Sequence, residues 1–473
     1  MTAAAPPAGA RFDRKLIAPM ILGSILNPIN SSIIAVSLVP IGNAFGAPTS
    51  QTAWLVSALY LATAIGQPVV GRLVDLFGPK RLFLAGAVLT AIAGVLGTLA
   101  PSLIVLIIAR FILGLGTCAG YPSSMLLIRL ESQRTGLASP AGVLTALSVS
   151  SQTIVVIGPT LGGLLINLGG WRTTFAINVP LAVASFVVAL VYLPSWTRPT
   201  PERTSRAASL DYPGIGLFAV TMVALLLFLM NPGLSHAYLA AVTVAAATAL
   251  AWWELRTAEP FIDLRLLGGN KPLLATYARN LLAFTVSYAF LYGLTQWMED
   301  SRGLSAAGTG LLLIPMSVVA IATSALTGRR PEIRGKLIVG AATQLIGSAL
   351  LLLLDGGSPI WLLVLTAVVI GIPQGLNSLA NQNAVFHQAD PDRLGSSSGL
   401  LRTFMYLGAM VAGAANGAFF GHAADTRGLH RIGMLLVVVA TLFLVLTVVD
   451  RSLARIGRPA EQPETEPGLA PAR

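Results

Sequence analysis

Charged residues are scarce in this chain of 473 residues, because Asp, Glu, Lys and Arg together make up only 10% of it. An ordinary soluble domain is about 25% charged, so this sequence has too few charges to cover a surface exposed to water. Hydrophobic residues make up 55%, and the mean hydropathy is +0.77. These values argue against a soluble protein and indicate a polytopic membrane protein.

Cysteine is almost absent as well. Cys118 is the only one, so no internal disulfide can form. The sequence contains no H-E-x-x-H zinc motif and no G-x-x-x-x-G-K-[ST] nucleotide-binding loop. We therefore expect that the protein is not an enzyme and has neither a cofactor nor a metal site.

Long apolar runs are abundant. A membrane-spanning helix needs roughly 20 apolar residues, whereas barrel strands are about 10 residues of alternating pattern. Continuous runs of helical length predict an all-α fold with fourteen transmembrane helices, at residues 16–40, 52–72, 81–100, 103–129, 141–168, 172–194, 212–231, 237–255, 274–298, 306–327, 336–354, 359–383, 396–421 and 429–449.

The basic residues indicate how these helices are oriented. The net charge is +11, and Lys and Arg collect in cytoplasmic loops of membrane proteins. With a cytoplasmic N-terminus, the outer side carries only Arg172, Arg302, Arg427 and Arg431. We therefore expect an even number of spans with both termini in the cytoplasm. Arg greatly outnumbers Lys and Ala is abundant, which points to a bacterium and hence to its plasma (inner) membrane. The positive charge is then a topology signal that also attracts anionic lipid, and no nucleic-acid partner is expected.

An internal repeat divides the chain. Gly71, Asp75 and Gly78 are spaced four and three apart, and "GRRPEIRGK" repeats this spacing at residues 328, 332 and 335. This predicts that spans one to six repeat as nine to fourteen, the plan of many transporters. Chance spacing is the alternative, because 47 of the 473 residues are glycine, but both motifs occupy the same topological position. The predicted parts are a cytoplasmic tail 1–15, a six-helix bundle 16–194, a linker with two extra helices 195–273, a second six-helix bundle 274–450, and a disordered cytoplasmic tail 451–473.

Three motifs in the first half carry a family resemblance. They are "GRLVDLFGPKR" from Gly71, "RFILGLG" from Arg110 and "GPTLGG" from Gly158. The sequence resembles the major facilitator superfamily, and its loop, fourth-helix and fifth-helix motifs are similar to these. "SLDYPGIGL" and "PFIDLRLL" look like the borders of the two extra helices in the fourteen-helix drug/proton antiporter branch.

The first motif is the candidate gating loop, formed by Gly71, Asp75, Gly78, Lys80 and Arg81. The glycines permit a tight turn and close helix approach. The aspartate is suited to accept hydrogen bonds at a helix start or to pair with a neighbouring basic residue. The resemblance implies that this loop latches two halves in an outward-open state. The alternative is that the two basic residues only anchor the topology.

The other two motifs suggest coupling. Arg110 lies inside a span, where a charge costs on the order of 3 kcal/mol and is usually functional. The resemblance implies a link to proton coupling, and the alternative is a structural arginine bonded to helix carbonyls. The antiporter-type motif comprises Gly158, Pro159, Gly162 and Gly163, and its proline should bend the helix. The resemblance implies antiport.

Polar and aromatic residues within the spans are candidates for lining a central cavity. They share a mid-span position or a helix face at spacing three to four. Contacts between helices are the alternative for the amides and tyrosines, and the alternative for the arginine is that it only snorkels toward the inner surface. The candidates are Asn27, Asn30, Tyr288, Tyr292, Gln374, Asn377, Asn381 and Arg402.

Acidic residues are missing from the middle of the spans, although the chain has nineteen of them. Proton coupling normally needs a group in the membrane that gains and loses a proton, and arginine is a poor carrier. The inventory therefore leaves proton-coupled and uncoupled transport both open. It also favours neutral or anionic substrates over cationic ones, and Arg110 is a candidate to attract an anion.

The main hypothesis is a secondary transporter that exports amphipathic organic compounds or drugs by alternating access, as a monomer in the lipid bilayer. Its partners would be a small organic substrate and, if transport is coupled, protons. One alternative is an uptake carrier or uniporter for a single metabolite. Another is a membrane protein that senses or assembles without transporting.

Overall fold

The computed structural model describes residues 12–47, 49–52, 54–135, 141–195, 211–230, 233–258, 260–304, 306–328, 330, 332–420 and 424–455. Within these ranges the chain is helical and contains no strand, which confirms the all-α prediction. Most of the expected N-terminal tail, most of the loop after residue 195 and the C-terminal tail beyond residue 455 lie outside the described residues.

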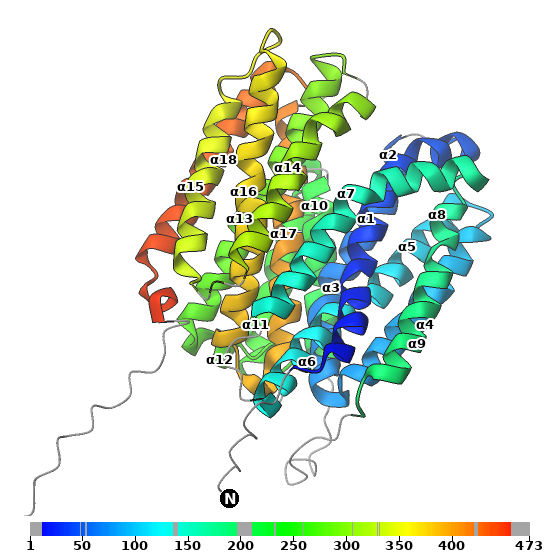
Figure 1. Ribbon diagram of the computed structural model, residues 1–473, viewed down its shortest axis with the longest axis vertical. Helices are drawn as coiled ribbons and strands as arrows, with labels where there is room; N and C mark the ends of the chain where they lie inside the picture. The colour runs from blue at the N-terminus through cyan, green and yellow to red at the C-terminus, as the bar shows by residue number, and fades with distance from the viewer. Residues whose placement is uncertain are drawn as a thin grey trace, which may run out of the picture.

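The first half of the chain forms one group of helices, coloured blue to green in Figure 1. Within it α1 packs along α7, α3 along α5, and α4 against α5 and α9. Its helices are α1 (Ile17–Phe45), α2 (Thr49–Thr52), α3 (Trp54–Phe77), α4 (Pro79–Thr98), α5 (Leu103–Thr117), α6 (Gly120–Thr135), α7 (Ala141–Gly169), α8 (Thr173–Ala176) and α9 (Asn178–Tyr192).

The last part of the chain forms a second group, in which α13 packs on α17, α14 on α16, and α15 on both α16 and α18. It lies beside the first group in Figure 1. Its helices are α13 (Lys271–Asp300), α14 (Ala306–Thr327), α15 (Arg334–Leu351), α16 (Ile360–Gln388), α17 (Leu394–Phe420) and α18 (Thr426–Val449).

Two helices between these groups pair with each other, α10 (Tyr212–Met230) and α11 (Ala237–Glu254), and a short α12 (Leu264–Gly269) follows. Asp211 joins the borders of the pair, because it accepts hydrogen bonds from the backbone N–H of Gly214 (2.9 Å) and of Phe261 (3.2 Å) and from the indole N–H of Trp253 (2.8 Å). α10 also touches α3 and α17, so the pair flanks the contact between the two groups.

Capping residues set several helix ends. The side chain of Asp425 accepts from the N–H of Gly428 (2.7 Å) at the start of α18, and that of Asn270 accepts from Leu273 (3.1 Å) at the start of α13. Such bonds satisfy donors that the first turn leaves free. Gly46 ends α1 with a left-handed φ of 61°, a conformation that glycine adopts without strain.

Large apolar side chains form stripes on the outer faces of the helices. Exposed residues along α4 are Val88, Ile92 and Val95, followed by Leu99 at its C-cap, and those of α18 include Val438, Leu442, Val445 and Val449. Both sets follow a spacing of four, three and four, which keeps them on one side of a helix. Continuous apolar surfaces of this kind are unfavourable in water and suit contact with lipid.

All fourteen predicted runs fall on helices of the structure. Eleven helices of the described part are long and apolar enough to cross a membrane, or twelve if the two parts of the bent α7 count as one span. The remaining two, α13 and α15, are more polar: α13 contains tyrosines and Arg279, and α15 begins with Arg334 and Lys336. The number fourteen therefore stays a prediction.

Candidate functional site

A cavity of about 150 Å³ lies between the two groups of helices. It is lined by α1, α3, α6, α7, α13, α16 and α17, and so draws on both halves of the chain. Its polar lining consists mostly of hydroxyl and amide side chains, namely Ser24, Asn27, Ser31, Ser148, Ser151, Gln152, Ser287, Gln374, Ser378 and Gln382. We call it the central cavity.

Asn27 holds the two halves together within the central cavity. Its amide nitrogen donates to the hydroxyl of Thr117 (3.1 Å), and its amide oxygen accepts from the hydroxyl of Tyr406 on α17 (2.9 Å). Pro28 follows directly and also lines the cavity. Asn27, a candidate for the cavity lining because of its mid-span position, thus lines the central cavity and also bonds to a residue of the other half.

Aromatic side chains form one wall of the central cavity. The rings of Tyr60 and Tyr406 lie 5.7 Å apart, and those of Tyr288 and Tyr292 are also 5.7 Å apart. Such distances are typical of favourable ring pairs. Tyr288 lines the central cavity, whereas Tyr292 lies outside its lining.

A second cavity of about 850 Å³ lies beyond this wall and is lined by both Tyr60 and Tyr292. It contacts the first residues of α3, including Val56, and the last turns of α17, including Gly417. Tyr60 lines both cavities and therefore separates them. We call the second cavity the outer vestibule, because it opens at the end of the molecule where α3 begins.

Arg402 is the only charged side chain among the described residues that line the central cavity. Its guanidinium carbon lies 4.1 Å from the centre of the Tyr121 ring, and its Nη1 lies 3.7 Å from the sulfur of Met405. No ion pair joins it to a carboxylate in the described part of the chain. The cavity thus contains a positive charge without an opposite one.

The lining of α16 differs from the row expected from sequence. Gln374, Ser378 and Gln382, spaced four apart, face the central cavity. Asn377 and Asn381 form the neighbouring row, which turns toward α15 and α13. Asn377 donates to the amide oxygen of Gln344 (3.4 Å), and Asn381 donates to that of Asn280 (3.3 Å). Rows at spacing three and four lie side by side on a helix, and here the neighbouring helices cover one of them.

Arg110 and Asn30 are buried together outside the central cavity. Arg110 donates from Nε to the carbonyl of Leu55 (2.9 Å) and from Nη1 to the carbonyl of Asn30 (3.2 Å). The side chain of Asn30 donates to Asn178 (2.7 Å). This is the geometry of an arginine that joins helices through their carbonyls. Its second terminal nitrogen has no hydrogen-bond partner in the described part of the chain.

Asp75 connects the end of α3 with the start of α17. Its Oδ1 accepts from the backbone N–H of Gly395 (2.8 Å), and its Oδ2 accepts from the N–H (2.8 Å) and hydroxyl (2.6 Å) of Ser396. A carboxylate is stabilised at a helix N-terminus by the free N–H groups and the helix dipole. Residues 320 positions apart in the sequence are thereby joined. We call the end of the molecule that holds this contact the Asp75 end.

Glycines let α3 and α17 approach each other at this contact. A Cβ atom at Gly71 would overlap the carbonyl oxygen of Gly395, and one at Gly399 would overlap that of Gln67. Gly395 to Gly399 reads G-S-S-S-G, which matches the spacing of a hydrolase nucleophile elbow. Here the glycines serve helix packing instead, because both lie against the backbone of α3.

The rest of the loop motif shapes the turn into α4. Gly78 has a φ of 88°, which disfavours any residue with a Cβ, and Pro79 occupies the first turn of α4. The Lys80 ammonium donates to the carbonyl of Leu190 at the end of α9 (2.9 Å). Arg81 is exposed.

The G-P-T-L-G-G segment lies in α7. The helix bends by 50° between Val155 and Thr160, as predicted, because Pro159 cannot donate a backbone hydrogen bond there. Gly158 and Gly162 lie against α1, where Cβ atoms would collide with Ser32 and approach Val36. Gly163 faces open space. The motif therefore bends α7 around α1.

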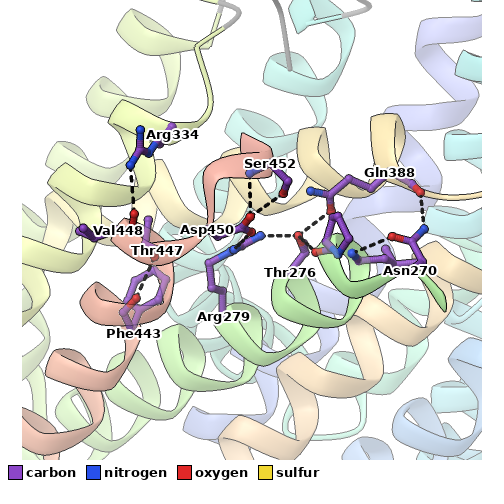
Figure 2. A network of polar contacts seen from close by, with 12 residues as sticks. Asn270, Thr276, Arg279, Arg334, Gln388, Phe443, Thr447, Val448, Asp450 and Ser452 are labelled. Carbon is purple, nitrogen blue, oxygen red and sulfur yellow. Dashed lines mark hydrogen bonds and ion pairs between the residues drawn. The ribbon is translucent and has the colours of Figure 1, made fainter. Parts of the chain in front are cut away.

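A second polar network lies at the Asp75 end and joins α13 to α18 (Figure 2). The Nη1 of Arg279 lies 2.5 Å from Oδ2 of Asp450, and the arginine side chain is completely buried. Asp450 also accepts from the backbone N–H of Ser452 (2.9 Å). Burial raises the pKa of Asp450, but the hydrogen bonds from Ser452 and Arg279 outweigh it and hold this pKa below the ordinary value. Sequence reasoning missed this pair, whose partners are distant in the chain.

Sequence reasoning also missed most of the cavity lining. Tyr60 and Tyr121 were visible as polar aromatic residues within apolar runs, which is the one signal that points to them. The serines of α1 and α7 gave no such signal, because serine also bonds to carbonyls of its own helix. Ser31, for example, donates to the carbonyl of Asn27 (3.0 Å).

Comparison with known proteins places these features in context. A model of the Major Facilitator Superfamily matches residues 20–413. The chain is 32% identical over 430 residues to the uncharacterized MFS-type transporter YwoD of Bacillus subtilis (strain 168), covering 90% of this chain and 94% of YwoD. It is 28% identical over 394 residues to the lincomycin resistance protein of Streptomyces lincolnensis, covering 81% of this chain and 79% of that protein.

A solved structure has the same fold. The crystal structure of the human organic anion transporter MFSD10 (TETRAN) matches with a TM-score of 0.67, covering 92% of this chain and 100% of that chain. The two sequences are 15% identical, so this likeness concerns the fold alone.

Proposed function

The chain belongs to the Major Facilitator Superfamily, and from this premise we propose that it is a secondary exporter of amphipathic organic compounds. Members of the family are multi-pass membrane transporters and not enzymes. The observation that carries the proposal is the central cavity, which both halves of the chain line and which one end of the molecule closes. Similarity to the lincomycin resistance protein supports export of drug-like molecules.

The cavity also suits an amphipathic ligand. Small-molecule sites are mainly apolar with a few well-placed polar groups, and here the lining combines tyrosine rings with amides and hydroxyls. A cavity of about 150 Å³ holds little more than one aromatic ring. We infer that larger compounds enter when the tyrosine wall moves and then share the outer vestibule.

In this proposal two six-helix bundles, 16–194 and 274–450, rock around the central cavity. All fourteen helices span the membrane, with α10 and α11 as the two extra ones. Both termini lie in the cytoplasm of a bacterial cell, and the transporter works as a monomer. The Asp75 end is then cytoplasmic and closed, and the outer vestibule faces outward. The Asp75 contact acts as the latch of the outward-open state.

The source of energy has two candidates. The G-P-T-L-G-G segment resembles that of antiporters and favours proton exchange. The central cavity, however, has no carboxylate among the described residues of its lining, which favours a uniporter or an uptake carrier that needs no proton. Flux in proteoliposomes with and without a pH gradient separates them, since only a proton antiporter accelerates with the gradient.

Accumulation of fluorescent compounds in cells with and without the protein tests export itself. The panel contains cationic, neutral and anionic compounds, and the amount of protein in the membrane is measured in parallel. We expect lower accumulation of at least one class when the protein is present. Equal accumulation across the whole panel would contradict the proposal.

A further inference from the structure

The central cavity holds a charge that the proposed export of amphipathic compounds does not by itself explain. Arg402 points into a space that is lined otherwise by neutral side chains, and no described carboxylate pairs with it. Asp75, on the neighbouring helix α3, is already bonded to Gly395 and Ser396. An unpaired charge within a membrane protein is costly and is usually functional.

A second unused polar group lies beside this charge. Tyr121 is 4% exposed, and its hydroxyl has no hydrogen-bond partner in the described part of the chain. Its ring packs against the guanidinium of Arg402, which fixes the direction of the arginine. Tyr121 and Arg402 thus both line the same cavity, although the hydroxyl itself is buried. A hydroxyl donor and a guanidinium with several N–H donors are both suited to an anionic oxygen.

The rest of the cavity lining determines which molecular body, bearing the anionic group, fits beside Arg402. The rings of Tyr60, Tyr288 and Tyr406 line the space with apolar faces, and Gln374 offers an amide. The ring faces suit a flat aromatic body. A carboxylate, sulfonate or phosphate at its edge would reach Arg402, whose planar fork binds such groups through two parallel hydrogen bonds.

We propose that the transported compounds are organic anions with an aromatic body, and that Arg402 and Tyr121 bind their anionic group. This inference rests on the proposed function and specifies its substrate class. It also transfers the anion-attracting role expected of Arg110 to Arg402, because Arg110 lies outside the cavity and is bonded to helix carbonyls.

A negative substrate removes the need for a proton carrier. The interior of a bacterial cell is electrically negative, so exporting one negative charge is favoured by the membrane potential. At 100 mV this drive corresponds to about a 50-fold concentration ratio for a monovalent anion. An anionic substrate driven by the membrane potential therefore needs no proton-carrying carboxylate, and the described lining of the central cavity contains none.

Matched ligands test the inference on the purified full-length protein. The probes are 2-naphthoate, its neutral amide 2-naphthamide, and the cation 2-naphthylmethylammonium, which share one ring system. Binding is followed by isothermal titration, and flux is followed in proteoliposomes. We expect naphthoate to bind about tenfold to a hundredfold more tightly than the amide, the range for a hydrogen-bonded charge. Equal or weaker binding of naphthoate would overturn the proposal.

Variants assign the preference to the two residues. Arg402→Gln should abolish the preference for naphthoate over the amide, and Arg402→Lys should retain part of it. Tyr121→Phe should reduce the preference severalfold. Arg427→Gln is the matched control, because this arginine is exposed at the start of α18, and it should behave as the wild type. A preference that persists in Arg402→Gln would refute the assignment.

Further outcomes distinguish a failure of the proposed substrate class from a failure of the proposed transport function. Chloride is the other anion that a guanidinium can hold, and we expect naphthoate binding to change less than twofold when about 100 mM chloride is added. Loss of binding in chloride would assign Arg402 to an inorganic anion. Flux of the amide or the cation without flux of naphthoate would refute the substrate class and leave export standing. Absence of flux for all three probes would count against the transporter itself, whereas binding would still report on Arg402.

Discussion

The contact between Asp75 and the start of α17 predicts how the transport equilibrium shifts when the charge of Asp75 is removed. Replacing Asp75 by Asn keeps the shape of the side chain but removes its charge, and it places an amide N–H₂ against a backbone N–H. The carboxylate now accepts three hydrogen bonds, from Gly395 and Ser396. Bonds to a charged group contribute about 1.5–3 kcal/mol each, and a helix terminus adds about 0.3–1 kcal/mol.

Asparagine retains one acceptor oxygen, so we estimate a loss on the order of 3 kcal/mol for the closed Asp75 end. This changes the ratio of closed to open molecules by more than about 100-fold. The fold should survive, because the contact joins the two halves and lies outside the core of each. The equilibrium therefore shifts toward molecules whose Asp75 end is open and whose outer vestibule is closed.

Cysteine labelling measures this shift. The single native Cys118 is buried and is replaced by alanine, and a cysteine is introduced at Ala414, which lines the outer vestibule. A maleimide that cannot cross membranes should label this cysteine readily with Asp75 present and much more slowly in Asp75→Asn. Asp390→Asn, at the same end of the molecule but bonded within its own turn, is the matched control. Equal labelling rates in all three proteins would refute the reasoning.

The other predictions concern separate parts of the structure. Tyr60→Ala should join the central cavity to the outer vestibule and raise the flux of bulky compounds severalfold, and unchanged flux would show that this ring is no barrier. Gly78→Ala should lower thermal stability by about 1 kcal/mol, because its φ of 88° disfavours a Cβ, and a stability equal to wild type would contradict this. Asp450→Asn should cost about 3 kcal/mol by leaving Arg279 buried without its partner, and Arg279→Gln in the same chain should recover part of the loss. Since the pKa of Asp450 is held below its ordinary value in the folded protein, its contribution to stability is present at neutral pH and is lost as the pH falls through that lowered pKa. Thermal melts recorded from neutral pH into the acid range check this.

The helical elements could be predicted from sequence because lipid as a solvent demands long apolar helices. Each predicted apolar run falls on a helix of the structure, and the bend in α7 lies where Pro159 lacks a backbone hydrogen-bond donor. The position of Asp75 at the end of a span also suggested a helix start as its partner. Which helix this was could not be derived, because the start of α17 lies 320 residues away.

The side-chain arrangement of the candidate site was harder to predict. Helix periodicity places Gln374, Asn377 and Asn381 on one broad face, but the rotation of α16 within its neighbours decides which row meets the cavity. Likewise, a buried arginine within a span is a sign of function or of helix packing. Only the partners of Arg110 and Arg402 show that the first joins carbonyls and the second faces a cavity.

Counterflow in proteoliposomes tests the central claim, that this chain moves organic compounds through the cavity between its two halves. Vesicles containing the purified protein are loaded with unlabelled 2-naphthoate, and the entry of a trace of labelled 2-naphthoate is followed without any ion gradient. An alternating-access carrier predicts saturable entry that is accelerated by the internal ligand and is slowed in Arg402→Gln. Entry that is neither saturable nor accelerated, and that matches protein-free vesicles, would contradict the account.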